Sequence, residues 1–222
     1  MCGIFGFSEL NAATRKLAPF VASEMMRRGT DSWGATDGEE VIKHLGPIAS
    51  TFEVPERWKR GIFHTRAASV GDVTVENSHP FAFEKETGGY VVGIHNGSIS
   101  NYVTINEKYQ RDFKVDSMHL FKHLAEGRDF SDLTGYGAIA WYEDGDLWLS
   151  KFNGGSLEIV KLSDGTIAFA STKDALVVGA LWAGLKVEVT YQIPTETRVH
   201  VQMEGGKPIV YNGARLPFGF RH

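Results

Sequence analysis

The sequence predicts an α+β protein built of antiparallel sheets that are covered by helices in layers. Short apolar runs typical of strands outnumber the helical segments, and the helices come in groups instead of alternating strictly with the strands. Strict alternation would have favoured a parallel sheet. Glycine contributes 25 of the 222 residues, which is more than usual and indicates the many turns of a strand-rich fold.

Residues 1–126 are predicted to contain three strands and two helices. Strands are expected at the apolar runs Cys2–Phe7, Gly61–Ala67 and Tyr90–His95. Apolar residues recur at helical spacing over Thr14–Arg27, which predicts an amphipathic helix. Asp116–Glu126 shows the same spacing and begins with an Asp-Ser pair that can cap a helix, so a second helix is expected there.

Turn signals follow some of these elements. Gly29 comes after the first helix, where a C′ glycine often ends a helix, and Thr30–Ser32 is interpreted as a turn. The dipeptides Asn96-Gly97 and Asn153-Gly154 are typical of two-residue hairpin turns.

The C-terminal half is predicted to be mostly strand. Four short strands are expected at Tyr136–Tyr142, Leu147–Phe152, Leu157–Leu162 and Thr166–Ala170. A helix is expected at Lys173–Ala183, followed by strands at Lys186–Thr190, Thr197–Met203 and Pro208–Tyr211.

Composition and patterning argue against several classes of protein. The net charge of −4 argues against a general nucleic-acid binder, which needs a basic surface. No apolar run reaches the roughly 18 residues of a membrane span, and the N-terminus lacks the basic region and cleavage site of a signal peptide, so the cytoplasm is the expected compartment. The single cysteine can form neither an internal disulfide nor a multi-cysteine zinc site. His119 and His123 have the spacing of a metal-binding pair but lack a further ligand, so no metal and no cofactor are expected.

Cys2 is a candidate nucleophile because of its position. Removal of Met1 would make Cys2 N-terminal, so its thiol and its own α-amino group would belong to the same residue. An α-amine has an ordinary pKa of ~7.7–8 and can act as a base near neutral pH, as in N-terminal nucleophiles. The alternative interpretation is a small buried residue of the first strand.

Four further features have both a chemical and a structural interpretation. Arg66 follows an apolar strand and could hold a carboxylate with two parallel hydrogen bonds, or form a surface ion pair. Asn96 and Gly97 could supply a side-chain and a backbone N–H to an oxyanion hole, or form a hairpin turn. Asp116 could bind a substrate ammonium or cap the following helix. His79, held extended before a proline, could orient a ligand or pack in the core.

Taken in order, these segments resemble the class II glutamine amidotransferase domains, which are N-terminal nucleophile hydrolases. The matching segments are Cys2–Gly6, Arg28–Gly34, His64–Ser69, Asn77–Phe81, His95–Asn101 and Asp116-Ser117, with a weaker match at Ala170–Leu176. The resemblance implies a four-layer αββα sandwich with two facing, mainly antiparallel sheets.

The resemblance also implies roles for individual residues. Cys2 is the expected nucleophile, and Asn96 and Gly97 are the expected oxyanion hole. Arg66 and Asp116 are expected to bind the α-carboxylate and the α-ammonium of glutamine. The remaining expected site residues are Arg28, which matches a family arginine near the nucleophile, and His79, Ala68 and Ser69, which would line the pocket.

The implied reaction is hydrolysis of the glutamine side-chain amide through a Cys2 thioester, giving glutamate and ammonia. One such domain would use nearly all of residues 1–222 and leave no room for a synthase domain. We therefore expect a glutaminase that supplies ammonia to a separate acceptor enzyme. Two alternatives remain open: a stand-alone amidohydrolase acting on glutamine or a γ-glutamyl compound, and a non-catalytic regulatory or binding protein that kept the fold.

Overall fold

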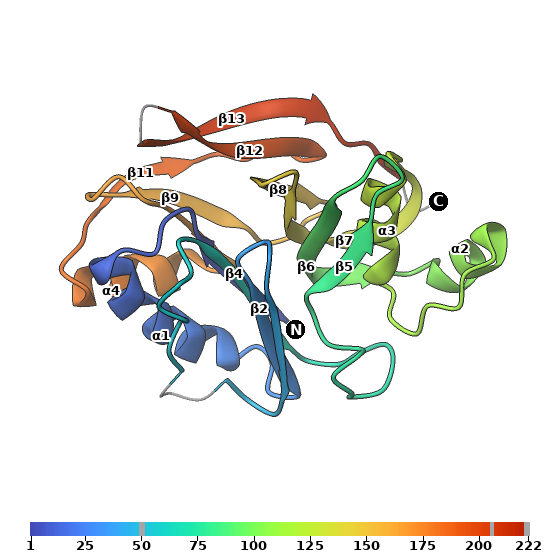
Figure 1. The fold of residues 1–222 in the computed structure, drawn as a ribbon, viewed down its shortest axis with the longest axis horizontal. Helices are drawn as coiled ribbons and strands as arrows, with labels where there is room; N and C mark the ends of the chain where they lie inside the picture. Colours follow the sequence, from blue (N-terminus) through green and yellow to red (C-terminus); the bar gives the residue numbers. More distant parts are fainter. Residues whose placement is uncertain (49–51, 205–206, 220–222) are drawn as a thin grey trace.

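The computed structural model describes residues 1–48, 52–204 and 207–219, and Figure 1 shows their fold. The helices are α1 (Ala12–Met26), α2 (Tyr102–Tyr109), α3 (Met118–Ala125) and α4 (Lys173–Trp182). The first sheet contains β1 (Gly3–Phe7), β2 (Ser32–Thr36), β3 (Val41–Leu45), β4 (Gly61–Arg66), β9 (Glu158–Leu162), β10 (Ile167–Ala170) and β11 (Val187–Tyr191). The second contains β5 (Phe81–Glu84), β6 (Tyr90–Ile99), β7 (Phe130–Glu143), β8 (Asp146–Phe152), β12 (Thr197–Glu204), β13 (Lys207–Arg215) and β14 (Phe218–Gly219).

Both sheets are antiparallel apart from the short β14, which runs parallel to β7. The strand order is β11-β9-β10-β1-β4-β2-β3 in the first sheet and β13-β12-β8-β7-β6-β5 in the second. The strand at the start of the chain, β1, therefore lies in the middle of its sheet, paired with β10 on one side and β4 on the other.

Side-chain alternation along the strands separates three apolar layers. In β1, Phe5 and Phe7 belong to the layer beneath α1 and α4, whereas Ile4 belongs to the layer between the sheets. Ile94 of β6 also lies between the sheets, and Trp141 of β7 lies in the third layer, which α3 covers. The resulting order of helix, sheet, sheet and helix, visible in Figure 1, confirms the predicted αββα sandwich.

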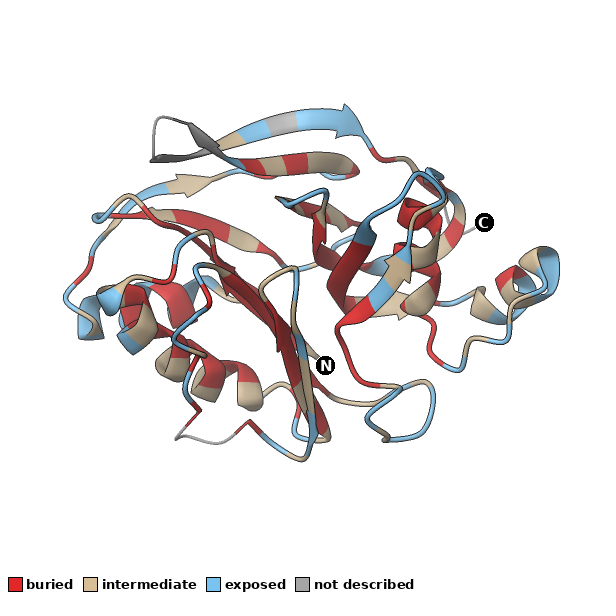
Figure 2. Ribbon diagram, viewed as in Figure 1, coloured by how far each residue is buried: buried red, intermediate tan, exposed pale blue. Residues whose placement is uncertain are grey.

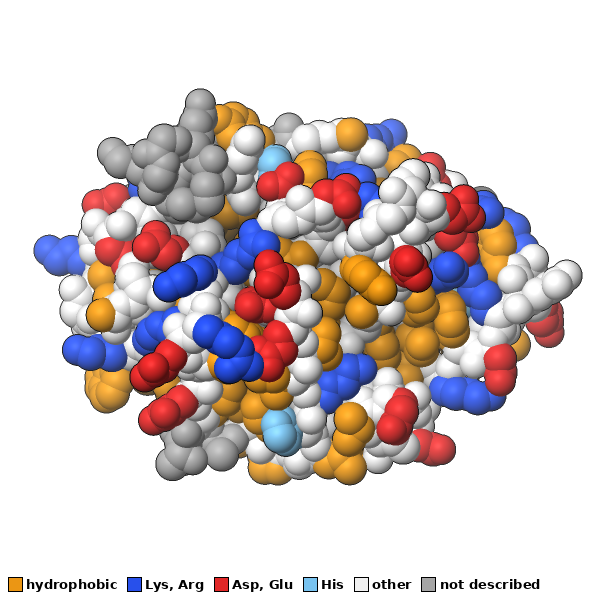
Figure 3. Space-filling model, in the orientation of Figure 1, with side chains coloured by type: hydrophobic (Ala, Val, Ile, Leu, Met, Phe, Trp, Pro, Cys, Tyr) orange, Lys and Arg blue, Asp and Glu red, His pale blue; other side chains and the backbone are white. Residues whose placement is uncertain are grey.

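The distribution of buried and charged residues fits this layering. Figure 2 shows the buried residues gathered on the central strands and on the helix sides that face the sheets. On the face shown in Figure 3, acidic and basic side chains are interspersed. Within the described part of the chain, we find no helix whose length and apolar character would let it cross a membrane.

The three predicted helices are confirmed, with small shifts in their ends. α1 begins two residues before its predicted start because the Asn11 side chain caps it, accepting hydrogen bonds from the N–H groups of Ala13 and Thr14. α2 has no predicted counterpart, because its sequence is mostly polar and its buried residue is Ile105. Such a short polar helix carries little periodic signal.

Each predicted strand is present, although β7 begins at Phe130, well before the predicted start at Tyr136, whereas β2, β3, β5 and β14 were not predicted. A turn is present at Asn153-Gly154, but it is not a hairpin, because β8 and β9 on either side of it belong to different sheets. The turn expected at Thr30–Ser32 is wrong at Ser32, which begins β2 and pairs with Arg66 of β4. The polar residues at the start of β2 do not predict a strand locally, and β2 is stabilised by its pairing with β3 and β4 on either side.

Candidate active site

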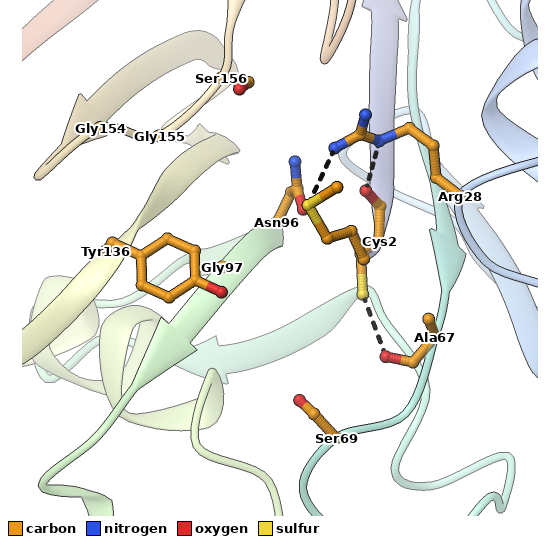
Figure 4. Close-up of a pocket in the computed structure, with 11 residues that line it drawn as sticks. Cys2, Arg28, Ala67, Ser69, Asn96, Gly97, Tyr136, Gly154, Gly155 and Ser156 are labelled. Carbon is orange, nitrogen blue, oxygen red and sulfur yellow. Dashed lines mark hydrogen bonds between the residues drawn. The ribbon is translucent and has the colours of Figure 1, made fainter.

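A cavity of about 320 Å³ lies beside the N-terminal end of β1. Its lining residues are Met1, Cys2, Arg28, Ala67, Ser69, Asn96, Gly97, Tyr136, Gly154, Gly155 and Ser156. Figure 4 shows that Cys2 and Ala67 reach it from the first sheet, and that Asn96 and Tyr136 reach it from the second. The cavity is therefore a product of the facing sheets and not of one local segment.

Cys2 directly precedes β1, and the alternation of that strand gives its side chain the same inward direction as Ile4. The Cys2 thiol donates to the carbonyl oxygen of Ala67 at 3.6 Å, as Figure 4 shows. Burial raises the pKa of the Cys2 thiol above its usual value, although the charge of Arg66 acts in the opposite direction. The thiol is therefore protonated near neutral pH and needs a base before it can act as a nucleophile.

Two residues that follow α1 form hydrogen bonds with Cys2 and with residues at the end of β4. Arg28 Nε donates to the Cys2 carbonyl oxygen at 2.9 Å. The Asp31 carboxylate accepts a hydrogen bond from the Ala68 N–H at 2.7 Å. The Asp31 N–H in turn donates to the Arg66 carbonyl oxygen at 2.9 Å. Asp31, which had no predicted role, thus anchors the residues that enter the cavity wall.

Gly29 is needed for close packing, so its interpretation as a helix C′ glycine is wrong. Gly29 does not have a positive φ angle. A Cβ atom at Gly29 would lie 2.4 Å from the carbonyl carbon of Arg66 and 2.6 Å from the nitrogen of Ala67. Only glycine allows the backbone after α1 to approach the end of β4 this closely.

Asn96 and Gly97 lie inside β6, so the hairpin-turn interpretation of this dipeptide is wrong. They are paired with Ala138 and Gly137 of β7. On the other side of β6 the pairing with β5 reaches only as far as Gly93. Among the described residues, the edge of β6 beyond Gly93 therefore has no strand neighbour on that side.

The backbone N–H of Gly97 points to this free edge. The Ser100 N–H donates to the Thr134 carbonyl oxygen of β7 at 2.7 Å, whereas the Ile99 N–H points away from β7 and donates to the Asp116 carboxylate at 2.6 Å. N–H groups alternate in direction along an antiparallel strand, so the Gly97 N–H has the same direction as that of Ile99. A backbone donor thus lies beside the side-chain amide of the preceding residue.

Asp116 does not cap α3, so the capping interpretation is wrong. The N-cap residue is Ser117, and it makes no side-chain capping bond. The Asp116 carboxylate, 4% exposed, accepts hydrogen bonds from the Ile99 N–H and from the Ser117 hydroxyl, the latter at 3.4 Å. These bonds hold the carboxylate at the same edge of β6 as Gly97.

Arg66 is buried, so its interpretation as part of a surface ion pair is wrong. The residue is only 3% exposed and is not among those that line the cavity. Its guanidinium donates to the carbonyl oxygens of Val70 at 2.8 Å, Gly71 at 3.3 Å and Asp72 at 3.0 Å. The loop after β4 is therefore wrapped around the Arg66 side chain.

His79 lies in the interior with His64 and does not line the cavity. The two rings lie 4.0 Å apart between centroids, and His64 Nε2 donates to the carbonyl oxygen of His95 at 3.0 Å. Burial lowers the pKa of His64 to about 3 and that of His95 to about 4. The rings of His64 and His95 are therefore neutral at physiological pH.

Tyr136 and the Gly154–Ser156 loop line the cavity but were not predicted to do so. Tyr136 lies across from Cys2 in Figure 4. Gly155 packs so tightly on β7 that a Cβ atom there would lie 1.8 Å from the Gly137 carbonyl oxygen. The local turn signal predicted that this loop exists, but it held no information on what the loop covers.

His119 and His123 of α3 are the pair with metal-binding spacing for which the sequence offers no further ligand. In the structure, Arg111 Nη1 lies 3.2 Å from Nδ1 of each ring. Over residues 1–48, 52–204 and 207–219, no cluster of three or more His, Cys, Asp or Glu side chains is arranged to hold a metal ion.

Known proteins similar to this chain were found both by sequence and by fold. The glutamine–fructose-6-phosphate aminotransferase (isomerizing) of Staphylococcus epidermidis is 30% identical over 190 residues, which cover 81% of this chain and 30% of that protein. The enzyme of the same name from Methanosarcina mazei is 36% identical over 145 residues, covering 56% of this chain and 22% of that protein. No protein-family model matches the chain.

The fold is similar to that of a solved glutamine phosphoribosylpyrophosphate amidotransferase from B. subtilis, with a TM-score of 0.68 and 18% sequence identity. That alignment covers 95% of this chain and 49% of the amidotransferase chain. The chain thus spans less than a third of either aminotransferase and about half of this amidotransferase. From the aminotransferase similarity, the αββα fold and the ordered motifs around Cys2, we conclude that the chain belongs to the class II glutamine amidotransferase domains of the N-terminal nucleophile hydrolases.

Proposed function

We propose that this chain hydrolyses the side-chain amide of glutamine to glutamate and ammonia, with Cys2 as the nucleophile. The observation that carries the proposal is that Cys2, Asn96 and Gly97 line one cavity. A thiol beside two N–H donors suits attack on a carboxamide, because negative charge develops on the carbonyl oxygen during that attack.

The proposed reaction requires that Met1 be removed, and Met1 is 79% exposed and therefore accessible to a peptidase. The free α-amine of Cys2 then takes the thiol proton, which the raised pKa of the buried thiol keeps in place near neutral pH. The thiolate forms a bond to the carboxamide carbon, and the carbonyl electron pair moves to the oxygen, which accepts hydrogen bonds from Asn96 and Gly97.

Collapse of this intermediate breaks the carbon–nitrogen bond. The ammonium group of Cys2 gives its proton to the leaving nitrogen, so ammonia departs and a γ-glutamyl thioester remains. Water then attacks the thioester carbon at the same oxyanion site, releasing glutamate and restoring the thiol.

We assign recognition of the amino-acid end of glutamine to Arg66 and Asp116. Both side chains are close enough to Cys2 for their opposite charges to act on the pKa of its thiol. A guanidinium has five N–H donors, and three bonds to loop carbonyls leave donors for a carboxylate. Arg28 supports the Cys2 backbone, and Ser69 lines the cavity next to Ala68, whose N–H is fixed by Asp31.

We also propose that the ammonia is used by a separate acceptor enzyme. The similar aminotransferases are named for transfer of an amino group from glutamine to fructose 6-phosphate, and most of their length lies outside the matched region. By analogy, the domain described here supplies the nitrogen, and the acceptor chemistry lies elsewhere.

Glutamate release from glutamine by the purified chain tests the proposal. We expect activity in protein whose intact mass shows loss of Met1, and no activity in Cys2→Ala. A chain carrying an uncleavable N-terminal extension is the matched control: it keeps the thiol but lacks the free Cys2 amine, so it should also be inactive. Cys2 is the only cysteine, so a glutamine-mimicking electrophile should modify a single site. Activity that survives in Cys2→Ala or in the extended chain would contradict the proposal.

The same assay addresses the acceptor. Glutamate release that increases when a co-purifying enzyme is added supports delivery of ammonia to a partner. A high rate in the isolated chain that no co-purifying protein changes would instead favour a stand-alone amidohydrolase.

A further inference from the structure

Ser171 is a buried polar residue that the proposed reaction leaves without a role. It directly follows β10 and is 3% exposed. Its backbone N–H donates to the carbonyl oxygen of Ile4 at 2.9 Å, which extends the pairing of β10 with β1 towards Cys2. Ser171 is not among the residues that line the cavity.

The Ser171 hydroxyl connects the two sheets next to the candidate site. Its Oγ accepts hydrogen bonds from the Ile4 N–H at 3.0 Å and from Asn96 Nδ2 at 3.1 Å. Its own proton is directed to the Ile4 carbonyl oxygen at 3.4 Å. The backbone of Ile4 therefore uses one lone pair of the Ser171 hydroxyl and its proton. The hydroxyl can then only accept a hydrogen bond from Asn96.

This pattern selects one orientation of the Asn96 side chain. An asparagine amide can present either its oxygen or its nitrogen to a neighbour, but a hydroxyl that can only accept requires the nitrogen. Nδ2 carries two N–H groups, and Ser171 accepts one of them. The second N–H has no protein partner in the ranges that the structure describes, so it is available to a ligand.

We infer that Ser171 is a positioning residue that holds the Asn96 amide with its second N–H ready for the oxyanion of the reaction. The inference rests on the proposed function, because the oxyanion forms only if Cys2 attacks a carboxamide. Without the Ser171 hydroxyl, the Asn96 amide can rotate and bring its oxygen to the place where a donor is required.

Substitution of Ser171 by alanine tests this inference, with Ser150→Ala as the matched control. Ser150 on β8 is also fully buried, but its hydroxyl has no hydrogen-bond partner among the described residues. Ser171→Ala should lower kcat for glutamate release by about 10-fold, as expected for one hydrogen bond, at unchanged KM. Ser150→Ala should change neither constant. Alkylation of Cys2 by iodoacetamide needs no oxyanion hole, so its rate should be the same in both variants.

A double-mutant cycle with Asn96→Ala identifies the residue through which Ser171 acts. Asn96→Ala should lower kcat by about 10²–10³-fold, and Ser171→Ala should cause no further loss in that background. Ser171→Thr keeps the hydroxyl and should retain most of the wild-type kcat, which guards against a variant that merely misfolds.

Three results would overturn the inference: an unchanged kcat in Ser171→Ala, an effect confined to KM, or losses that multiply in the double variant. Multiplied losses would mean that Ser171 acts through β1 instead of Asn96. A wild-type chain that releases no glutamate would overturn the proposed function itself, so the two failures are distinguishable.

Discussion

Replacement of Gly29 by alanine would force apart the two backbones that meet at the cavity wall. The new Cβ atom would lie 2.4 Å from the carbonyl carbon of Arg66 and 2.6 Å from the nitrogen of Ala67. Ordinary contact begins at 3.4 Å, so the backbones must separate by about 1 Å. Backbone atoms cannot rotate out of the way as the end of a flexible side chain can.

The displaced atoms are those that support the proposed reaction. The Ala67 carbonyl oxygen contacts the Cys2 thiol at 3.6 Å, and Arg66 begins the loop that its own side chain holds. A misplacement of about 1 Å can cost about 10²-fold in rate, so kcat/KM for glutamine should fall by roughly 100-fold in Gly29→Ala. The overpacking should also lower the free energy of unfolding by about 1–3 kcal/mol.

Glutamate-release kinetics and urea unfolding measure the two effects separately. Gly179→Ala in α4 is the control, because its Cβ would lie 2.5 Å from the Leu17 side chain on the outer side of the first sheet. That variant should change in stability but keep the wild-type kcat/KM. If Gly29→Ala kept the wild-type kcat/KM and lost only ~1 kcal/mol of stability, Gly29 would be behaving as a simple C′ glycine and the reasoning would be refuted.

Two further predictions concern the partly buried Asp31 carboxylate and two buried histidines. Asp31→Ala should lower kcat/KM for glutamine by roughly 10-fold, because the Ala68 N–H loses a charge-assisted acceptor at 2.7 Å; Asp31→Asn keeps an acceptor and should be milder, so equal effects of the two variants would count against this role. The free energy of unfolding should decrease as the pH falls below ~6.5, because unfolded histidines take up protons there, whereas folded His64 and His95, with pKa values of about 3 and about 4, do not. Each ring should lower the free energy of unfolding by about 1.4 kcal/mol for each pH unit between pH ~6 and ~4. Urea unfolding across that range measures the effect, and a stability that did not change with pH would contradict the prediction.

The sequence by itself predicted the layered fold and the position of the candidate nucleophile. The apolar run Cys2–Phe7 predicts a buried strand without any partner strand, and the alternation of side chains in a strand places Ile4 and Phe5 on opposite faces. A lone cysteine at position 2, followed by ordered motifs that resemble one family, was sufficient to indicate an N-terminal nucleophile. These features are local, so they can be recognised from the sequence without knowledge of the tertiary structure.

Only the tertiary structure decided what several motif residues do. The Asn96-Gly97 dipeptide favours a turn locally, yet pairing with β7 keeps it in a strand, and β5 ends before it can pair with Gly97. Gly29 resembles a helix terminator until the end of β4 is placed against it.

The physical reason is that these outcomes depend on contacts between distant segments. The bond between Ser171 and Ile4 joins residues 167 positions apart. Local propensities are worth about 1 kcal/mol or less, and burial and strand pairing in the finished core override them. Cys2, Asn96 and Gly97 could therefore be predicted from the sequence, whereas Tyr136 and the Gly154–Ser156 loop enter the cavity only through the pairing and facing of the two sheets.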